Sequence, residues 1–265
     1  MKRKVLSIVF VVIVIFGCKK DDNPTEPIGA NSIWYDGISY PVDSLQKWGF
    51  GITQLDYNHN DTDYSWYIDQ GNTGYASSNN CGPTSVTMAA KWFDKNFSKT
   101  VEEARNTYPN NGGWWYTNNI IDYLNKYSIY NSTVSFRDSL QLTDIIKSGN
   151  IFILCINTQY LKYNSNQSQR INRFYSYGGG HFILIKGVRN VDNKLLFEAY
   201  DPNSINMKYS DNSLKGKNRH YSYPDLSSAI KQWWNYIIVI SKNRFNKNID
   251  AFRVNTKAIT HAWGR

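Results

Sequence analysis

Three residues of this sequence, Cys81, His181 and Asp201, are of the types that carry out nucleophilic acyl chemistry. A cysteine thiolate attacks carbonyl carbon, a histidine can remove the thiol proton, and a carboxylate can orient the imidazole and stabilise its charged form. The residues occur in the order Cys, His, Asp, and the aspartate follows the histidine by 20 residues. Whether they act together depends on the elements that position them.

Cys81 lies where a run rich in Asn, Gly and Pro changes into a predicted helix. From residue 86 to residue 93 the apolar residues recur at the three- and four-residue spacing of a buried helical face. Pro83 suits a first helical turn, and Thr84 and Ser85 are expected to cap the helix start. The positive end of the helix favours the thiolate. A buried structural cysteine is the alternative, but the polar neighbours are poor material for a core.

His181 follows three glycines and opens an apolar segment, residues 181–188, that predicts a buried strand. The glycines allow backbone angles that side chains would forbid. A lone histidine in such a segment is often a hydrogen-bonded core residue. The other histidines, His59, His220 and His261, have polar or terminal contexts, so we predict that His181 is the catalytic base.

Asp201 directly follows the next predicted strand, residues 195–200, and precedes Pro202. A turn at residues 190–193 would join this strand to the one that His181 opens, as an antiparallel hairpin. The end of the second strand would then lie beside the beginning of the first, which predicts that Asp201 orients the imidazole. The alternative is a simple Asp-Pro turn.

Gln70 ends a short apolar segment and precedes a loop that leads to Cys81. A side-chain amide here can donate an N–H to the oxyanion that forms when a thiolate adds to a carbonyl, beside a backbone N–H at the helix start. A solvent-facing glutamine is the alternative. We expect no cofactor and no metal site, because the sequence has no cluster of His and Cys ligands.

The order of the predicted elements indicates an α+β fold in which helices come first and an antiparallel sheet follows. Residues 31–67 indicate short strands and loops. A long loop, residues 157–177, is typical of segments that carry substrate contacts or form a lid. Helices are predicted at residues 86–93, 100–108, 114–127, 140–146 and 224–234, and strands at residues 151–156, 181–188, 195–200 and 236–241.

Composition and charge argue against a nucleic-acid-binding surface. The 265 residues include 30 Lys and Arg and 21 Asp and Glu, a net charge of +9. Removal of the three basic residues near the N-terminus leaves 27 basic against 21 acidic residues, a net charge of +6. The remaining basic residues are scattered without a stripe, which indicates a solvated face. With 41% hydrophobic residues, the chain can bury the core of one domain.

The three cysteines have separate explanations, and three predict no disulfide framework. Cys155 lies in a continuous apolar run, residues 151–156, and is predicted to be a core residue. A disulfide between Cys81 and Cys155 is an alternative that would abolish the thiol chemistry.

The N-terminus resembles a bacterial lipoprotein signal. Three basic residues precede a short apolar run at residues 5–16, which is typical of an export peptide. The sequence Ile15-Phe16-Gly17-Cys18 resembles a lipobox, so we expect a signal peptide at residues 1–17 and lipidation of Cys18. An ordinary cleaved signal or an uncleaved anchor is the alternative.

Residues 18–31 are polar and contain two prolines, which predicts a lipidated tether, and residues 32–265 are expected to form the folded domain. The charged residues 19–22 resemble a tag that sends lipoproteins to the surface of some diderm bacteria. The expected location is therefore the cell envelope, anchored to a bacterial membrane through the N-terminal lipid, with the outer membrane and cell surface among the candidates.

Three motifs and their order are similar to those of papain-like cysteine peptidases, especially the bacteriocin-leader (double-glycine) peptidase group, cysteine-peptidase family 39, and its stand-alone relatives. The motifs are Cys81-Gly82-Pro83-Thr84-Ser85, Gly180-His181-Phe182-Ile183-Leu184-Ile185 and Asp201-Pro202. The resemblance covers residues 67–240 and implies a papain-like fold. It implies Cys81 as nucleophile, His181 as general base and later acid, Asp201 as orienting residue and Gln70 as oxyanion donor. In transporter-linked members the glutamine lies nearer the cysteine.

The resemblance implies a cysteine peptidase that hydrolyses peptide or isopeptide bonds of a peptide or protein substrate, and the N-terminal signal adds the expectation that it is secreted and lipid-anchored. Two alternatives stay open. One is acyl transfer, or cutting of cell-wall peptides, on the same three residues. The other is a binding module that keeps the fold without activity, with Trp114, Trp115 and the tyrosine-rich loop as its recognition face.

Overall fold

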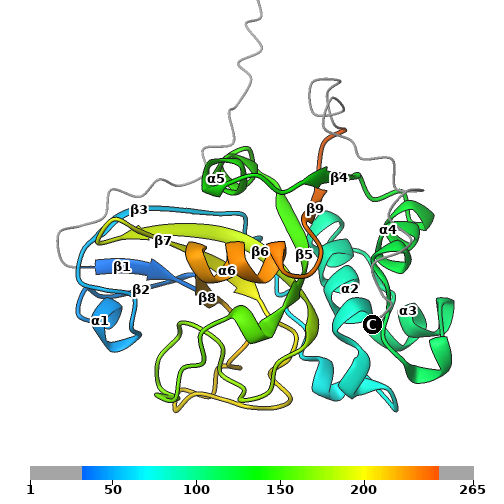
Figure 1. Ribbon diagram of the computed structural model, residues 1–265, viewed down its shortest axis with the longest axis horizontal. Coiled ribbons are helices and arrows are strands. Elements are labelled where there is room, and N and C mark those ends of the chain that lie inside the picture. Colours follow the sequence, from blue (N-terminus) through cyan, green and yellow to red (C-terminus); the bar gives the residue numbers. More distant parts are fainter. Residues whose placement is uncertain (1–31, 245–265) are drawn as a thin grey trace, which may run out of the picture.

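A seven-stranded antiparallel sheet is the framework of residues 32–244, the part of the chain that the computed structural model describes (Figure 1). The signal peptide, the lipidated Cys18 and the tether predicted for residues 1–31 lie outside the described residues, as does His261. The seven strands are β3 (Gln54–His59), β4 (Asn131–Ser135), β5 (Ile151–Asn157), β6 (Gly180–Val191), β7 (Lys194–Tyr200), β8 (Arg219–Ser222) and β9 (Tyr236–Ile240). Two further strands, β1 (Ser32–Tyr35) and β2 (Ile38–Pro41), form a separate two-stranded sheet. The α-helices are α1 (Ser44–Lys47), α2 (Cys81–Phe93), α3 (Val101–Thr107), α4 (Thr117–Lys126), α5 (Ser139–Lys147) and α6 (Tyr223–Lys231). Short 3₁₀ helices are η1 (Gln70–Asn72), η2 (Ser77–Asn79), η3 (Asn110–Gly112) and η4 (Thr158–Tyr160).

The sheet has the strand order β4-β9-β5-β6-β7-β8, and β3 pairs with β6. The predicted hairpin is confirmed: Asp192 and Asn193 join β6 to β7, with φ angles of 49° and 60°. Positive φ at both central residues is what the commonest two-residue hairpin turn requires. Leu184 pairs with Tyr200, so Asp201 leaves β7 close to the beginning of β6.

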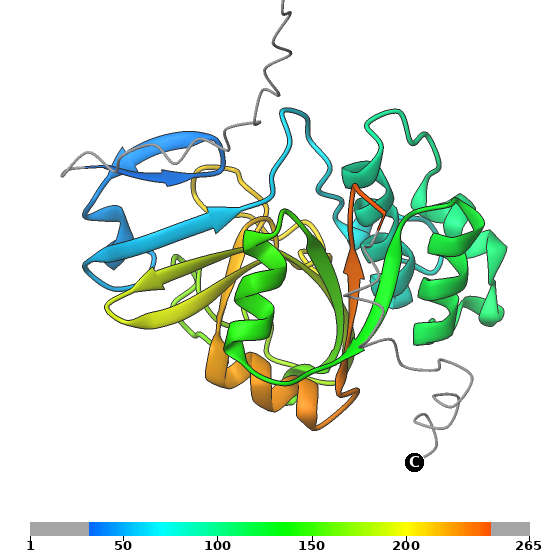
Figure 2. The same cartoon turned by 90° about the horizontal axis from the view of Figure 1, so that it is seen from above.

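Helices cover both faces of the sheet (Figure 2). On β5, Ile151, Ile153 and Cys155 pack in one core cluster with α2 and α4. The alternate residues of the strand, at positions 152, 154 and 156, pack in a second cluster with α5 and α6 on the other face. Because both faces are buried, the strand reads as a continuous apolar run rather than as an alternating pattern. Cys155 is 1% exposed, as expected of a core residue, and neither it nor Cys81 is in a disulfide.

The predicted α+β fold is confirmed, with local differences. Strand β4 was not expected, because its Asn, Ser and Thr residues carry little apolar signal. Helix α4 begins at Thr117 rather than at residue 114. Tyr116 is the N-cap residue with an extended backbone, and its N–H donates to the Asn119 side chain at 2.9 Å instead of to a helical carbonyl. None of the helices in residues 32–244 is long and apolar enough to span a membrane.

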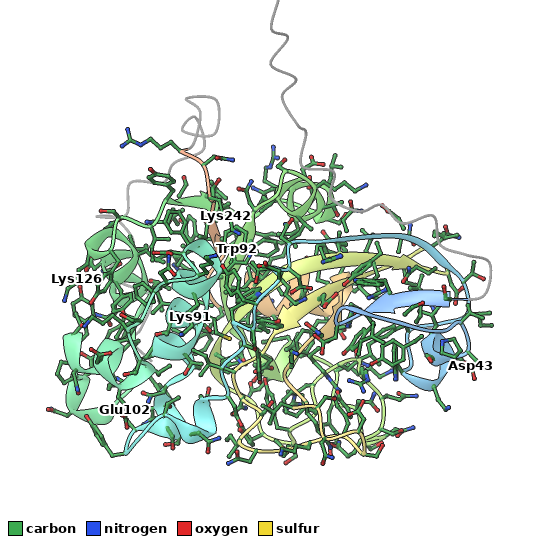
Figure 3. The ribbon with its side chains drawn as sticks, turned by 180° about the vertical axis from the view of Figure 1, so that it is seen from behind. Asp43, Lys91, Trp92, Glu102, Lys126 and Lys242 are labelled. Atoms are coloured by element: carbon green, nitrogen blue, oxygen red, sulfur yellow. The ribbon has the colours of Figure 1, made fainter. Side chains whose placement is uncertain are left out.

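Trp92 fixes the C-terminal end of α2 (Figure 3). Its indole N–H donates to the Asn60 carbonyl at 2.6 Å, and Lys242 Nζ lies 5.0 Å from the ring centroid. Both partners belong to segments far from α2 in the sequence. The end of α2 opposite Cys81 is therefore held in place by residues from distant parts of the chain.

A buried ionic cluster joins β6, β7 and β8 to the segment that follows β3, contrary to the expectation that basic residues form a solvated face. Lys186 Nζ lies 2.7 Å from both Asp61 Oδ2 and Glu198 Oε1, and Lys186 and Glu198 are fully buried. Arg189 and His220, equally buried, lie 4.0 Å and 3.6 Å from Glu198 Oε2. Burial is the largest effect and raises the pKa of Glu198, but the charges of Lys186, His220 and Arg189 and the hydrogen bond from Lys186 together outweigh it, so the net pKa lies below its usual value.

We predict that Glu198→Ala lowers the free energy of unfolding by about 3–5 kcal/mol, because it removes the buried carboxylate beside Arg189 and leaves the buried Lys186 with Asp61 as its remaining anionic partner. Chemical denaturation followed by circular dichroism measures the change. Lys99→Ala is the matched control, since its ion pair with Glu103 is about half exposed and such surface pairs contribute little to stability. Equal, small effects of the two substitutions would contradict the prediction.

Candidate active site

Cys81 is the first residue of α2, and its side chain is almost buried. The expected capping by Thr84 and Ser85 is wrong: both lie buried within the helix, and Asn80 is the N-cap residue. The Asn80 side chain turns away from the helix, because its Nδ2 donates to a loop carbonyl at 2.9 Å and its Oδ1 accepts from Arg105 Nε at 2.7 Å. With no side chain capping it, the helix start can direct its amides and dipole toward the thiol.

His181 lies between Cys81 and Asp201. Its Nε2 is 2.8 Å from Asp201 Oδ1, and the imidazole also hydrogen bonds to the Cys81 side chain. Since Nε2 faces the carboxylate, Nδ1 is the ring nitrogen left for the thiol. The structure thus brings together three side chains that are up to 120 residues apart, because α2 packs on β5 and β6 and the β6–β7 hairpin delivers Asp201.

The pKa values of the thiol and the imidazole shift in opposite directions. Burial raises the pKa of Cys81, but the hydrogen bond and charge of His181 and the backbone N–H groups of Phe182 and Gly82 bring it below its usual 9.0. Burial lowers the pKa of His181, yet the Asp201 carboxylate and Cys81 raise it to about 10. Because the thiol pKa lies below that of the imidazole, the thiolate–imidazolium ion pair is favoured over the neutral thiol–imidazole pair.

Both the N–H and the carbonyl of Asp201 are held by hydrogen bonds, in addition to its carboxylate. Its N–H donates to the Gly216 carbonyl at 2.9 Å, and its carbonyl accepts the Tyr67 hydroxyl at 2.8 Å. A Cβ added to Gly216 would lie 1.9 Å from the Asp201 carbonyl oxygen, so only glycine fits there. Burial raises the pKa of Asp201, but the His181 charge and hydrogen bond contribute to a net lowering.

Gln70 lies in η1, and its side chain is buried at 2% exposure, which excludes the solvent-facing alternative. Its Nε2 donates to the carbonyls of Ser77 and Ser78, at 3.1 Å and 3.4 Å, and its backbone N–H donates to the Pro202 carbonyl at 2.8 Å. Among the described residues, its Oε1 has no hydrogen-bond partner. The structure places the amide against η2, the turn directly before Cys81, and joins η1 to the loop after Asp201.

Arg105 was missed by the sequence reasoning, which counted it among the scattered basic residues. It is 1% exposed and donates to Asn80 Oδ1 and to the carbonyls of Asn79 and Gly113, at 2.7, 2.8 and 2.7 Å. It thereby ties the start of α2 to α3 and to the loop before α4. The sequence does contain an indication of this burial, because the helical spacing from Val101 puts Arg105 on the buried face of α3.

The loop at residues 157–177 is held by two buried arginines. Arg173 donates to the carbonyls of Leu161, Ser176 and Tyr177. Arg219 donates to the carbonyls of Gln169, Ile171 and Asn172. Because these bonds satisfy main-chain oxygens along the loop, its end is fixed where it approaches His181.

Three tyrosines near the site were also missed, because nothing in the local sequence distinguishes them from the other tyrosines. Tyr175 and Tyr221 both donate their hydroxyls to Asp201. Tyr177 is 56% exposed, stacks on Tyr175 with ring centroids 5.0 Å apart, and exchanges hydrogen bonds with the Asn203 side chain. The wall of the site beside His181 is therefore aromatic.

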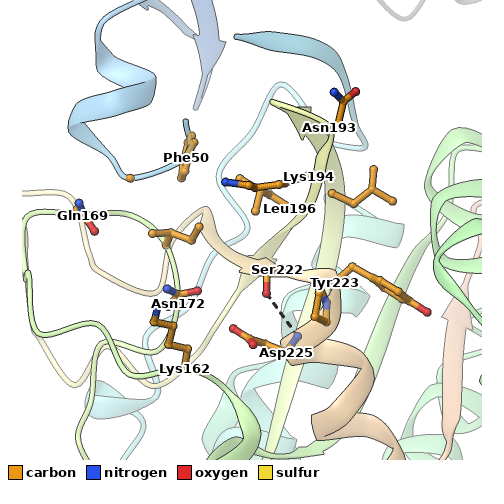
Figure 4. Close-up of a pocket in the computed structure, with 14 residues that line it drawn as sticks. Phe50, Lys162, Gln169, Asn172, Asn193, Lys194, Leu196, Ser222, Tyr223 and Asp225 are labelled. Carbon is orange, nitrogen blue, oxygen red and sulfur yellow. Dashed lines mark hydrogen bonds between the residues drawn. The ribbon is translucent and has the colours of Figure 1, made fainter. Parts of the chain in front are cut away.

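A separate cavity of about 780 Å³ is lined by residues 49–50, 162, 169, 171–172, 193–196 and 222–225 (Figure 4). On its wall, Ser222 Oγ accepts the Asp225 N–H at 3.4 Å and caps α6. Neither Cys81 nor His181 lines it. Within residues 32–244, no group of three or more His, Cys, Asp or Glu side chains could hold a metal ion.

Comparison with known proteins agrees with this geometry. A model of the "Peptidase_C39 like family" matches residues 57–231, which include Cys81, His181 and Asp201. No curated protein matches the chain. A solved structure described as "Crystal structure of UfSP from C.elegans" is similar with a TM-score of 0.42 and 12% identity, over 70% of this chain and 34% of that one. The chain thus spans about a third of the length of that protein. On the family match, the chain belongs to the Peptidase_C39-like family.

Proposed function

We propose that Cys81, His181 and Asp201 form the catalytic triad and hydrolyse peptide or isopeptide bonds. The observation that carries the proposal is the position of the His181 imidazole, which hydrogen bonds to the Cys81 thiol and to the Asp201 carboxylate. The opposite pKa shifts of Cys81 and His181 support it, because they favour the thiolate that attacks carbonyl carbon.

In the first half-reaction the Cys81 thiolate attacks the carbonyl carbon, and the electron pair of the C=O bond moves to oxygen. The imidazolium of His181 then donates its proton to the leaving nitrogen as the C–N bond breaks, which leaves a thioester and a neutral imidazole. In the second half-reaction His181 takes a proton from water, the hydroxide attacks the thioester, and the thiolate leaves. Asp201 stabilises the imidazolium while it exists.

The oxyanion requires two donors, which we assign to the Cys81 backbone N–H at the start of α2 and to Gln70 Nε2. Nε2 carries two hydrogens, which in the structure are donated to the carbonyls of Ser77 and Ser78, so the longer bond, to Ser78 at 3.4 Å, has to break for Nε2 to donate to the oxyanion. The burial of Gln70 beside the turn before Cys81 supports the assignment.

The experiment that tests the function is product analysis with a peptide library. The full-length protein, in detergent, is incubated with the library, and mass spectrometry searches for new amino termini. Family membership supports kinship with the double-glycine peptidases, so half of the library carries Gly-Gly before the cut. Ammonia release with an amine acceptor and without cleavage would replace hydrolysis by acyl transfer, and binding without any product would favour the inactive binding module.

The anchoring part of the proposal rests on the sequence of residues 15–18. We propose a signal peptide at residues 1–17 and a lipid on Cys18 that holds the peptidase at a bacterial membrane in the cell envelope. Labelling of bacterial cells with palmitate should mark the wild-type chain and leave Cys18→Ala unlabelled. Equal labelling of both would rule out Cys18 as the lipid site.

We predict a bell-shaped dependence of kcat/KM on pH. The rate rises as the Cys81 thiol ionises, with a midpoint below the usual thiol pKa of 9.0. It falls again when His181 loses its proton, and since Asp201 holds the imidazolium the alkaline midpoint is expected at about pH 10. Initial rates with a fluorogenic peptide from pH 4 to 11 measure both limbs. An alkaline limb near 6.5, the ordinary histidine value, would contradict the ion pair.

A further inference from the structure

The carboxylate of Asp201 has two oxygens in different environments. Oδ1 faces His181 Nε2 at 2.8 Å and accepts the Asn203 N–H at 2.9 Å. Oδ2 accepts the hydroxyl of Tyr221 at 2.6 Å and that of Tyr175 at 3.2 Å. Asp201 is fully buried, so these partners satisfy the carboxylate in place of water.

The two tyrosines come from separate parts of the fold and are themselves buried, Tyr221 at 0% and Tyr175 at 4% exposure. Tyr221 lies on β8, the neighbour of the strand that ends before Asp201. Tyr175 lies in the loop that Arg173 holds by its carbonyls, and its ring meets that of His181 edge to face at 6.1 Å. Two independent elements therefore converge on one oxygen.

We propose that Tyr221 and Tyr175 are positioning residues of the peptidase reaction: they hold Oδ2, keep Asp201 ionised and aim Oδ1 at the imidazole of His181. The inference rests on the proposed triad. With both hydroxyls in place the carboxylate cannot rotate without losing a donor, and a buried oxygen left without a donor costs free energy. The hydroxyls hold the imidazolium in place through Asp201, and the imidazolium in turn stabilises the thiolate of Cys81.

The groups around Asp201 determine the direction in which the pH profile shifts when the tyrosine hydroxyls are removed. The titratable and charged groups that face it directly are His181 on β6, Tyr221 on β8, Tyr175 in the loop and Tyr67 before η1. Farther out are Cys81, Tyr177 and Arg219. Hydroxyl donors stabilise the carboxylate over the carboxylic acid. Without the two hydroxyls, Asp201 is protonated at a higher pH than in the wild type. A protonated Asp201 no longer stabilises the imidazolium of His181, and the Cys81 thiolate in turn loses the stabilising charge of the imidazolium.

Phenylalanine substitutions remove the hydroxyls and keep the rings. The full-length protein is compared as wild type, Tyr221→Phe, Tyr175→Phe and the double variant, by kcat/KM and by the rate of Cys81 alkylation with iodoacetamide from pH 4 to 9. Tyr221→Phe should lower kcat/KM roughly tenfold at pH 6 and move the acid limb of both profiles to higher pH. The hydrogen bond from Tyr175 is longer than that from Tyr221, so Tyr175→Phe should shift the acid limb less. The double variant should show the largest shift.

Tyr209→Phe is the matched control, because its buried hydroxyl contacts Arg219 rather than Asp201 and its acid limb should stay at the wild-type position. Circular dichroism shows whether each variant is folded, and Tyr175→Phe keeps the test open if Tyr221→Phe does not fold. Acid limbs unchanged in the folded variants, with rates lowered equally at every pH, would overturn the inference and leave the triad standing. A wild-type Cys81 that alkylates like an ordinary thiol would overturn the proposed function itself.

Discussion

Cys81→Ala is expected to lower kcat/KM for peptide hydrolysis by about 10⁴- to 10⁶-fold. The reason is the loss of the only sulfur that the described structure places at the start of a helix and against an imidazole. Without it, no thioester forms and His181 has no thiol to activate. Steady-state rates with a cleaved peptide from the library measure the loss, and a thiol-reactive probe should no longer label the site.

Cys155→Ala is the matched control, because Cys155 is buried in the same core cluster and is not a member of the triad. Burial is the first cause of a pKa well above the usual thiol value, so Cys155 stays protonated and unreactive. The control should keep the wild-type rate. A Cys81→Ala protein that still cleaves the peptide would show that the nucleophile lies elsewhere.

His181→Ala is expected to lower kcat/KM by about 10²- to 10⁴-fold, the usual contribution of a general acid and base. The thiol of Cys81 would lose the partner that lowers its pKa, while the burial that raises it would persist. Alkylation of Cys81 at pH 6 should therefore slow together with catalysis. Stopped-flow alkylation and steady-state kinetics on the same preparation measure the two effects.

His59→Gln serves as the histidine control, since His59 lies 3.3 Å from Asp61 in the ionic cluster and does not contact Cys81 or Asp201. It should leave the rate and the pH profile unchanged. If His181→Ala slowed catalysis but left Cys81 fully reactive at pH 6, the thiolate would owe its stability to the helix alone, and the ion-pair interpretation would be wrong.

Much of the fold follows from local sequence patterns. The apolar spacing at residues 86–93 predicted the buried face of α2, and the apolar runs at residues 151–156 and 181–188 predicted the two central strands. The turn residues 190–193 predicted the hairpin that brings Asp201 near His181. These inferences succeed because helix and strand periodicity, and turn preferences, depend on residues close together in the chain.

The exact start of α2 could not be predicted in the same way. Thr84 and Ser85 are good capping residues, yet the helix begins at Cys81 because Asn80 is held from outside, by Arg105 on α3. Local capping preference was therefore outweighed by a tertiary contact across 25 residues.

The chemical types in the site, their order and most of the elements that present them can be read from the amino-acid sequence. Which atoms meet depends on the fold: Nε2 of His181 faces Asp201, two tyrosines hold the other carboxylate oxygen, and the Gln70 amide packs against η2. The fold also decides that Lys186 and Glu198 are buried as a pair. The physical reason is that hydrogen-bond partners and burial depend on packing between segments that are distant in the chain, and no local pattern records that packing.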